Sequence, residues 1–398
     1  MTTAPAPSRA VPGTRAYRRI SVALFLAGGS TFSLLYCVQP LLPVFARDFG
    51  IDAAASSLSL SFATALLALA IAGAAMASEN LGRRGLMFGS LLLAALLNIA
   101  VTAAHSWTTL LVLRALEGLA LGGVPAIAMA YLAEETDPRG LGFSMGLYIA
   151  GTAFGGMAGR VSAGLLAQLF SWRVALLLIG AAGVAAAIGF IALAPPSRHF
   201  ARARHFDAGH HLAAWAGHLR RRPLRRLFVI GFLVMGAFVT VYNYVGFRLM
   251  APPYSFDQRE LGLIFIIYLF GIGASSLAGA LADRIGPRRV LSAGILLAAL
   301  GVGLTLLQPL PLLLLGIVVV TIGFFSAHSV ASGWVGSLAA GTKGHASSLY
   351  LLAYYIGSSV AGSAGGWFWA AGGWPIVAAF TFGLLALAFA ATIGAAAP

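Results

Sequence analysis

The sequence predicts an all-α membrane protein with twelve transmembrane helices in two six-helix bundles, and three observations support this prediction. First, 60% of the 398 residues are hydrophobic and only 9% are charged, with a mean hydropathy of +0.91. A soluble domain could not hide so much apolar surface in one core. Second, runs of about 20 apolar residues recur along the chain, each long enough to span a hydrocarbon layer of about 30 Å. Third, a charged turn at Gly82 returns at Gly286, which suggests a repeated half.

The apolar runs and the residues that interrupt them locate the twelve spans. They are expected at 19–45, 53–77, 86–104, 107–131, 141–167 and 172–194, then at 226–249, 258–281, 289–307, 312–335, 346–370 and 374–396. A polar, arginine-rich segment separates the two sets. The expected organisation is therefore an N-terminal tail (1–18), a first bundle (19–194), a linker (195–225) and a second bundle (226–398).

The distribution of basic residues predicts the orientation. Nineteen of the 25 lysines and arginines fall in the tail, the linker and the loops on one side, whereas four fall on the other side. Basic loops remain in the cytoplasm, so both termini are expected there. The net charge of +14 is explained by this topology, and no nucleic-acid partner is expected. The single cysteine, Cys37, excludes an internal disulfide framework.

Matching residues support the repeat. Three pairs recur at offsets of 202–205: Asp52 with Asp257, Tyr148 with Tyr350, and Trp172 with Trp374. Each aspartate is expected to cap a helix, and each tryptophan to lie at the membrane interface. Two halves repeated in the same direction are related by an axis along the membrane normal.

Four motifs resemble those of the major facilitator superfamily. Residues 279–289 (GALADRIGPRR) are similar to its cytoplasmic loop signature, and residues 75–84 (AMASENLGRR) form a weaker copy. Residues 114–123 (RALEGLALGG) look like its fourth-helix motif. Residues 151–156 (GTAFGG) resemble its fifth-helix antiporter motif, with Thr152 where proline is usual. The resemblance covers residues 19–396 and implies the major facilitator fold.

Within that superfamily, three segments look most like bacterial inner-membrane efflux permeases for sugars or drugs: residues 36–43, 155–160 and 241–244. The resemblance implies a secondary active transporter that works by alternating access, with proton-coupled efflux of a small organic solute. An uncoupled facilitator of the same fold stays open because of Thr152, and a membrane receptor or scaffold is a third alternative. The chain is expected to act as a monomer in the bilayer.

An enzyme is not expected. The sequence has no nucleotide-binding loop and no metal-ligand spacing among its histidines, so neither a cofactor nor a metal site is predicted.

Ionisable residues inside a span are costly and usually functional. Glu117 is the one carboxylate well inside a predicted span, and Arg114 lies three residues before it on the same helical face. We expect Glu117 to pair with Arg160, Arg114 or both, and to be the leading proton carrier; a static ion pair between helices is the alternative. His328 is a second candidate for proton coupling, or else a hydrogen-bonded packing residue.

The expected substrate-binding residues combine these charges with tyrosines and amides. They are Tyr36, Gln39, Arg114, Glu117, Tyr148, Arg160, Tyr242, Asn243, Tyr350 and Tyr354. Aromatic rings and neutral amides suit a small amphipathic or polyhydroxylated ligand, although tyrosines near span ends also serve as interfacial anchors. Gly151, Gly155 and Gly159 form a ridge of small residues that is typical of close helix packing.

The two charged turns are expected to close the cytoplasmic side. The gating residues are Glu79, Gly82, Arg83, Arg84, Asp283, Arg284, Gly286 and Arg288. A carboxylate near the positive end of a facing helix can hold the halves together. Control of topology by positive charge alone is the alternative.

Overall fold

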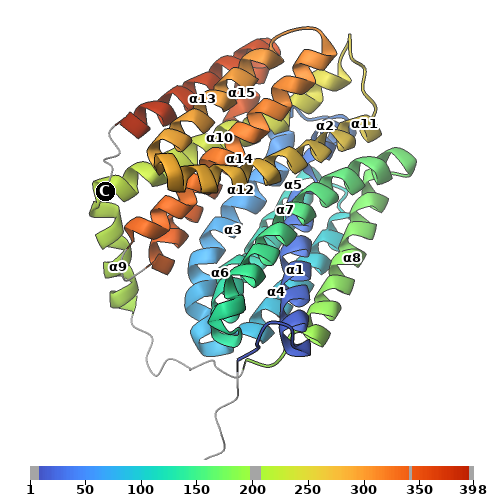
Figure 1. Cartoon of the computed structure of the whole chain (residues 1–398). Coiled ribbons are helices and arrows are strands. Elements are labelled where there is room, and N and C mark those ends of the chain that lie inside the picture. The colour runs from blue at the N-terminus through green and yellow to red at the C-terminus, as the bar shows by residue number, and fades with distance from the viewer. Residues whose placement is uncertain (1–8, 198–207, 340–342, 394–398) are drawn as a thin grey trace, which may run out of the picture.

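The computed structural model describes residues 9–197, 208–339 and 343–393, with only the backbone described at 74–81 and at a few further positions. Apart from one isolated bridge between Ala10 and Thr136, the regular structure in these ranges is helical (Figure 1). The first half contains α1 (Arg15–Tyr36), η1 (Gln39–Leu41), α2 (Leu42–Phe49), α3 (Ala53–Leu81), α4 (Arg83–Val101), α5 (Trp107–Leu121), α6 (Pro125–Glu135), α7 (Pro138–Leu169) and α8 (Trp172–Leu193). After α9 (Ala208–Arg220), the second half contains α10 (Arg222–Met250), α11 (Gln258–Leu263), η2 (Ile264–Ile267), α12 (Tyr268–Ile285), α13 (Pro287–Thr305), α14 (Leu310–Leu338) and α15 (Lys343–Ile393).

The described helices account for the predicted twelve spans. Ten segments are long and apolar enough to cross a membrane. One of them, α15, has 51 residues and leaves helical geometry at Gly372 and Gly373, so it contains two spans joined by a kink. The shorter α5 and α6 together supply one more span, broken at residues 122–124. The all-helical fold predicted from hydropathy is therefore confirmed.

The fourth span differs from the single helix predicted at 107–131, because it is divided into α5 and α6. Pro125 opens α6 at its first turn. A proline has no N–H and its ring collides with the carbonyl four residues earlier, which belongs to Leu121, the last residue of α5. The glycines before the break allow close packing: a Cβ on Gly118 would lie 2.0 Å from the carbonyl oxygen of Ala63 in α3.

The predicted ridge of small residues packs as expected, and the second half repeats it. A Cβ on Gly155 of α7 would lie 2.0 Å from the carbonyl oxygen of Gly29 in α1. A Cβ on Gly357 of α15 would lie 2.1 Å from the carbonyl oxygen of Phe232 in α10. Gly155 and Gly357 are 202 positions apart, the offset already seen in the sequence. Thus the same pair of helices makes the same backbone approach in each half.

The repeated aspartates and tryptophans behave differently from each other. The carboxylate of Asp52 accepts from Ala55 N–H at 2.6 Å, and Asp257 forms a full capping box, so both caps are confirmed. The tryptophans, predicted to lie at the membrane interface, are buried against neighbouring helices. Trp172 donates to Asp48 and Trp374 donates to Thr305. These internal bonds satisfy the indole N–H groups that an interfacial ring would present to headgroups.

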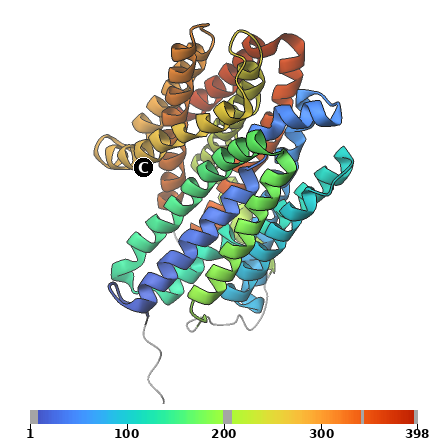
Figure 2. The ribbon, with the colours of Figure 1, turned by 90° about the vertical axis from the view of Figure 1, so that its right-hand side faces the viewer.

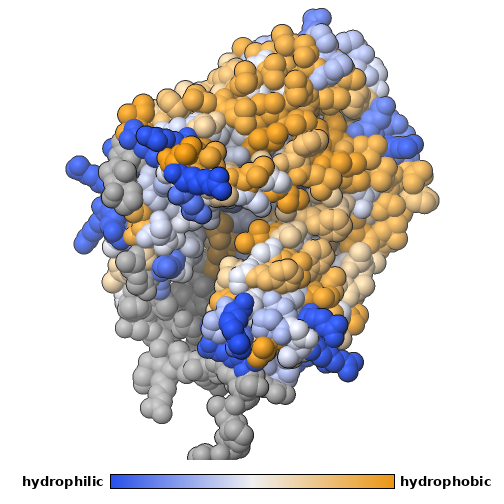
Figure 3. Space-filling view, in the orientation of Figure 1, coloured by the Kyte–Doolittle hydropathy of each residue, from blue (hydrophilic) through white to orange (hydrophobic). Residues whose placement is uncertain are grey.

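The two halves lie side by side, with the helices inclined to one another (Figures 1 and 2). Large apolar side chains are exposed over much of the outer surface, whereas hydrophilic residues gather at its ends (Figure 3). Exposed leucines in a band of this kind face lipid in a helical membrane protein.

Contacts between the halves concentrate at one end of the molecule. Ser61 in α3 bonds to Ser363 in α15 at 2.8 Å, and one turn further Thr64 bonds to Ser359 at 2.7 Å. Gln258 at the start of α11 donates to the carbonyl of Pro40 at 2.6 Å. This end lies opposite the charged turns at Gly82 and Gly286. On the side of α6 and α9 the surface is hollowed between the halves (Figure 3).

Candidate functional site

A fully buried ion pair lies inside the first half. Arg114 and Glu117 are both 0% exposed, and Arg114 Nη1 lies 2.6 Å from Glu117 Oε2. The spacing of three residues on α5 puts both side chains on one face. The structure therefore brings Glu117 to Arg114, one of the partners left open by the sequence.

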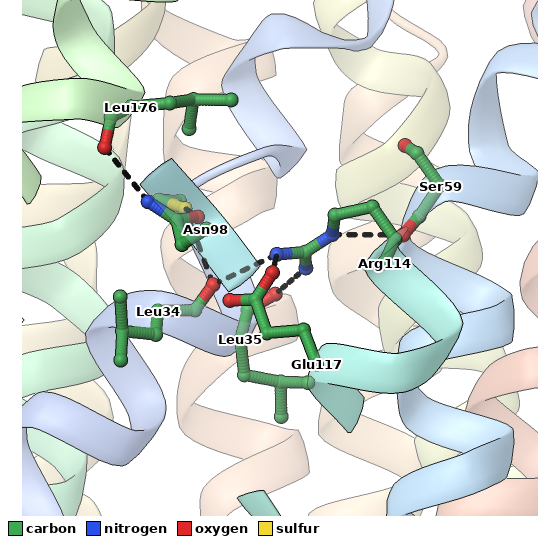
Figure 4. A network of polar contacts seen from close by, with 8 residues as sticks. Leu34, Leu35, Ser59, Asn98, Arg114, Glu117 and Leu176 are labelled. Atoms are coloured by element: carbon green, nitrogen blue, oxygen red, sulfur yellow. Dashed lines mark hydrogen bonds and ion pairs between the residues drawn. The ribbon is translucent and has the colours of Figure 1, made fainter. Parts of the chain in front are cut away.

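Arg114 also fixes the end of α1 (Figure 4). Its Nη1 and Nη2 donate to the carbonyls of Leu34 and Leu35, at 3.2 and 2.6 Å, and its Nε donates to Ser59 in α3 at 3.2 Å. Because α1 ends at Tyr36, the last carbonyls of the helix need donors from outside it. The guanidinium thus joins three helices while it neutralises Glu117.

Only one of the two carboxylate oxygens of Glu117 has a hydrogen-bond partner among the described residues. Its Oε2 accepts from Arg114, whereas its Oε1 is buried and has no hydrogen-bond partner among the described residues. A buried carboxylate oxygen without a donor is costly. A proton on Oε1 would remove the carboxylate charge, and Arg114 would keep its three carbonyl acceptors.

Two further polar residues beside the pair were missed by the sequence reasoning. Asn98 in α4 donates to the carbonyl of Leu176 in α8 at 2.7 Å, and Cys37 Sγ lies 3.7 Å from Asn98 Oδ1 (Figure 4). A signal existed, because Asn98 is the one amide side chain in the predicted third span. Both residues lie at the junction of α1, α4 and α8.

Arg160 lies at the seam between the halves and has a different partner. Its Nε donates to Gln39 Oε1 at 2.6 Å, and Nη1 donates to the carbonyl of Gly156 at 2.8 Å. Gln39 Nε2 in turn donates to Asn243 Oδ1 at 2.8 Å. The chain Arg160–Gln39–Asn243 therefore crosses from α7 through η1 to α10, and no ion pair joins Arg160 to another described residue.

Aromatic rings from both halves surround the Arg160 guanidinium. Its central carbon lies 4.1 Å from the ring centre of Tyr36, 4.8 Å from that of Tyr268 and 5.2 Å from that of Phe265. Ring faces attract a cation and partly replace an acid as its partner. Tyr36 was predicted from the sequence, whereas Phe265 and Tyr268 were not, because no sequence pattern links either of them to Arg160.

The remaining predicted lining residues fall into three places. Tyr242 bonds through its hydroxyl to Thr321 at 2.7 Å and its ring stacks on Phe265, so it belongs to the Arg160 surroundings. Tyr148 lies apart from them, in the core of the first half against Gly28. The predicted set is therefore not one continuous lining.

The third group is an aromatic stack within the second half. His328 Nδ1 lies 3.0 Å from the Tyr350 hydroxyl, and the imidazole ring centre lies 5.8 Å from that of Phe324 and 4.5 Å from that of Tyr354. These side chains leave no space for a water molecule between them. Phe324 also stacks on Phe238, whose ring centre lies 5.7 Å from that of Tyr268, so this stack adjoins the Arg160 group.

The charged turns have the backbone that the sequence predicts. Gly82 and Gly286 have φ values of +84° and +93°, which glycine adopts without strain. Arg83 pairs with Glu134 at 2.6 Å within the first half.

The other predicted gating residues show no link between the halves. Arg84 donates to the carbonyl of Ile191, and Arg288 donates to that of Ile393 at 2.8 Å. Asp283 and Arg284 are exposed and make no hydrogen bond or ion pair with another described residue. The side chain of Glu79 lies outside the described residues.

Comparison with known proteins identifies the family. The model of the Major Facilitator Superfamily matches residues 22–272 and 238–397. The chain is 45% identical over 374 residues to the uncharacterized MFS-type transporter YybF of Bacillus subtilis, covering 94% of this chain and 92% of that protein. It is also 45% identical over 378 residues to the inner membrane transport protein YnfM of Escherichia coli, covering 94% and 90%.

Solved structures agree in fold. A variant of the nucleoside transporter NupG superposes with a TM-score of 0.79 at 14% identity, over 94% of this chain and 99% of that one. A bacterial homologue of the human lysosomal transporter Spinster, in an inward-facing and occupied conformation, gives 0.75 at 16% identity, over 96% and 97%. The chain belongs to the major facilitator superfamily and is a multi-pass membrane transporter, not an enzyme.

Proposed function

We propose that this transporter exports a small organic solute from the cytoplasm in exchange for protons, by alternating access across the bacterial inner membrane. The observation that carries the proposal is the sealed Arg114–Glu117 pair with its free carboxylate oxygen. In a membrane interior such a pair is expensive to maintain, and a membrane protein usually retains one because it is used.

Glu117 suits reversible protonation because its partner, Arg114, has other hydrogen-bond acceptors. Arg114 has three carbonyl acceptors besides the carboxylate, so a proton on Glu117 would not leave the guanidinium without partners. Both side chains are sealed from solvent in this conformation. Proton exchange therefore requires water to reach Glu117 in another conformation of the transport cycle, while the Arg114 bonds within the first half are kept.

The seam around Arg160 suits the solute. It offers one cation, two amides and several aromatic rings contributed by both halves, so a ligand bound there would contact both moving bodies. Neutral hydrogen-bonding groups and ring faces favour an amphipathic or polyhydroxylated molecule. Asn243 Nδ2 is buried without a partner among the described residues and is available to such a ligand.

The conformation supports an inward-open state if the basic turns face the cytoplasm, as their charge predicts. The bonds Ser61–Ser363 and Gln258–Pro40 then close the outer side, while the charged turns lie apart. In the opposite state Asp283 would approach the first half and latch it. Asp283→Asn should slow transport with unchanged insertion into the membrane, and a normal rate would remove the latch.

The coupling is tested in proteoliposomes loaded with a pH-sensitive dye. Sugars and tetraphenylphosphonium are added as probes, and proton movement is recorded together with counterflow of the radiolabelled probe. Wild type should move protons with a transported probe, whereas Glu117→Gln should retain counterflow and lose the proton signal. The control Glu260→Gln makes the same change in an exposed helix cap and should behave as wild type.

An uncoupled facilitator is the second candidate, and it is favoured by the complete seclusion of Glu117 behind Arg114. It predicts probe counterflow without proton movement in wild type, and an unchanged pH dependence in Glu117→Gln. Either result would overturn proton coupling while leaving the transport fold intact.

A further inference from the structure

A basic cavity of about 530 Å³ opens at the end of the first half where α1 begins and α8 ends. The side chains that matter in its lining are Arg9, Arg15, Arg19, Arg84 and Glu135. It lies about a whole bundle length from Gln39 and the Arg160 seam, because α1 separates the two. Neither the transport path nor the charged-turn latch accounts for this cavity.

The cavity is built to receive negative charge. Four arginines line it against one carboxylate. Arg9 and Arg15 make no hydrogen bond or close ion pair with any described residue, although Arg9 lies near Asp137, and Arg84 Nε is buried without a partner. The first turn of α1 adds the positive end of a helix dipole. The guanidinium donors of Arg9 and Arg15 and the Nε of Arg84 therefore have no hydrogen-bond acceptor within the described chain.

The two inner arginines are held in position by α8. Arg19 donates to the carbonyls of Ala192 and Leu193, and Arg84 donates to that of Ile191. Each caps the carboxyl end of that helix with part of its guanidinium. Helix capping accounts for these donors, but not for the cavity or for the orientation of Arg9 and Arg15.

A separate apolar groove of about 210 Å³ lies further along the same helix. It begins at Phe25 and Leu26 and is walled by α7 and α8, including Phe154, Ala182 and Ala186. Leu26 follows Arg19 by seven residues, two helical turns or about 10 Å. Figure 2 shows α1 between α7 and α8 on the face turned to the viewer, so this groove lies on the outside of the bundle.

We propose that the first half binds an anionic phospholipid along α1, with the phosphate among the arginines and an acyl chain in the groove. Basic clusters at the cytoplasmic ends of transmembrane helices attract anionic headgroups, and each arginine near the surface contributes to that attraction. A soluble phosphate compound would use the cavity alone. The apolar groove two turns away is the feature that favours a lipid.

The headgroup is tested with Arg9→Gln/Arg15→Gln in the full-length protein purified in a non-ionic detergent. Thermal unfolding is followed while dioleoyl phosphatidylglycerol, dioleoyl phosphatidylcholine or glycerol 3-phosphate is titrated. Wild type should show a saturable rise in melting temperature with phosphatidylglycerol only, and the double variant should bind it about 25-fold more weakly, about fivefold per arginine.

The control Arg18→Gln/Arg220→Gln removes the same charge from exposed positions that do not line the cavity. It should keep the wild-type affinity. An equal loss in this control would reduce the effect to net charge, and equal binding of glycerol 3-phosphate would make the ligand a soluble phosphate; either result overturns the lipid site.

The acyl groove is tested separately with Ala182→Phe, which fills it, against Ala185→Phe, an exposed neighbour outside its lining. Ala182→Phe should weaken phosphatidylglycerol binding severalfold, and Ala185→Phe should leave it unchanged. Equal affinities in both variants would show that no chain occupies the groove, and the proposal would fail.

Discussion

The two buried arginines of the first half are neutralised in opposite ways. Arg114 has an acid three residues away on its own helix and three backbone carbonyls, all within one half. Arg160 has no acid: it bonds to Gln39 and Gly156 and lies among rings from both halves. One arginine is locked inside a rigid body, whereas the other joins two bodies that must separate.

This difference indicates which contact can be broken in a transport cycle. Separating a buried ion pair exposes an uncompensated charge to a low dielectric, which is costly. Separating an arginine from amides and ring faces costs less, and water or solute can replace those partners. We therefore expect the Arg114 group to move as a unit and the Arg160 group to reorganise.

The largest effect should come from Arg114→Leu. It leaves Glu117 buried without a counter-ion, and loss of one partner of a buried pair costs about 3–5 kcal/mol. We expect a large drop in melting temperature and poor recovery of folded protein. The double variant Arg114→Leu/Glu117→Leu should be more stable than the single one; equal instability would mean that the carbonyl bonds dominate.

Arg160→Leu should cost less stability and affect the seam. It leaves the Gln39 oxygen without its donor, which costs about 1–3 kcal/mol, but it strands no opposite charge. The seam is reported by disulfide formation in Ser61→Cys/Ser363→Cys, since these side chains meet at 2.8 Å. Arg160→Leu should lower the cross-linking yield, whereas Glu117→Gln should not. A drop in both would contradict the separation of the two groups.

Asn243→Leu removes only the last bond of the chain across the seam and keeps a similar volume. One neutral hydrogen bond contributes about 1 kcal/mol, so the melting temperature should fall slightly. Combined with Arg160→Leu the losses should be less than additive, because both act through Gln39. Strict additivity in unfolding measurements would mean that the chain is not coupled.

The two arginines also show which contacts of the site could be predicted from the sequence and which could not. The Arg114–Glu117 pair follows from a spacing of three on one helix, and the twelve spans and both capping aspartates follow from local patterns. The partner of Arg160 could not be predicted from a local pattern, because it depends on where η1 and η2 lie against α7.

Other features had a signal in the sequence that is easily misinterpreted. Pro125 and the glycines before it indicate a break in the fourth span, and Asn98 is an amide within an apolar run. Trp172 donates a hydrogen bond to Asp48, which lies 124 positions away. Residues on one helix face can be paired from spacing, whereas residues joined across the seam require the packing of both halves.

The smallest effect should come from the ring faces around Arg160. Tyr268→Leu removes a cation–π contact of about 0.5–1 kcal/mol, whereas Tyr268→Phe keeps the ring, and the Tyr268 hydroxyl has no hydrogen-bond partner among the described residues. Tyr268→Phe should therefore match wild type in Ser61–Ser363 cross-linking, and Tyr268→Leu should reduce it modestly. If Tyr268→Phe were the more damaging change, the hydroxyl and not the ring face of Tyr268 would be the group that the seam uses.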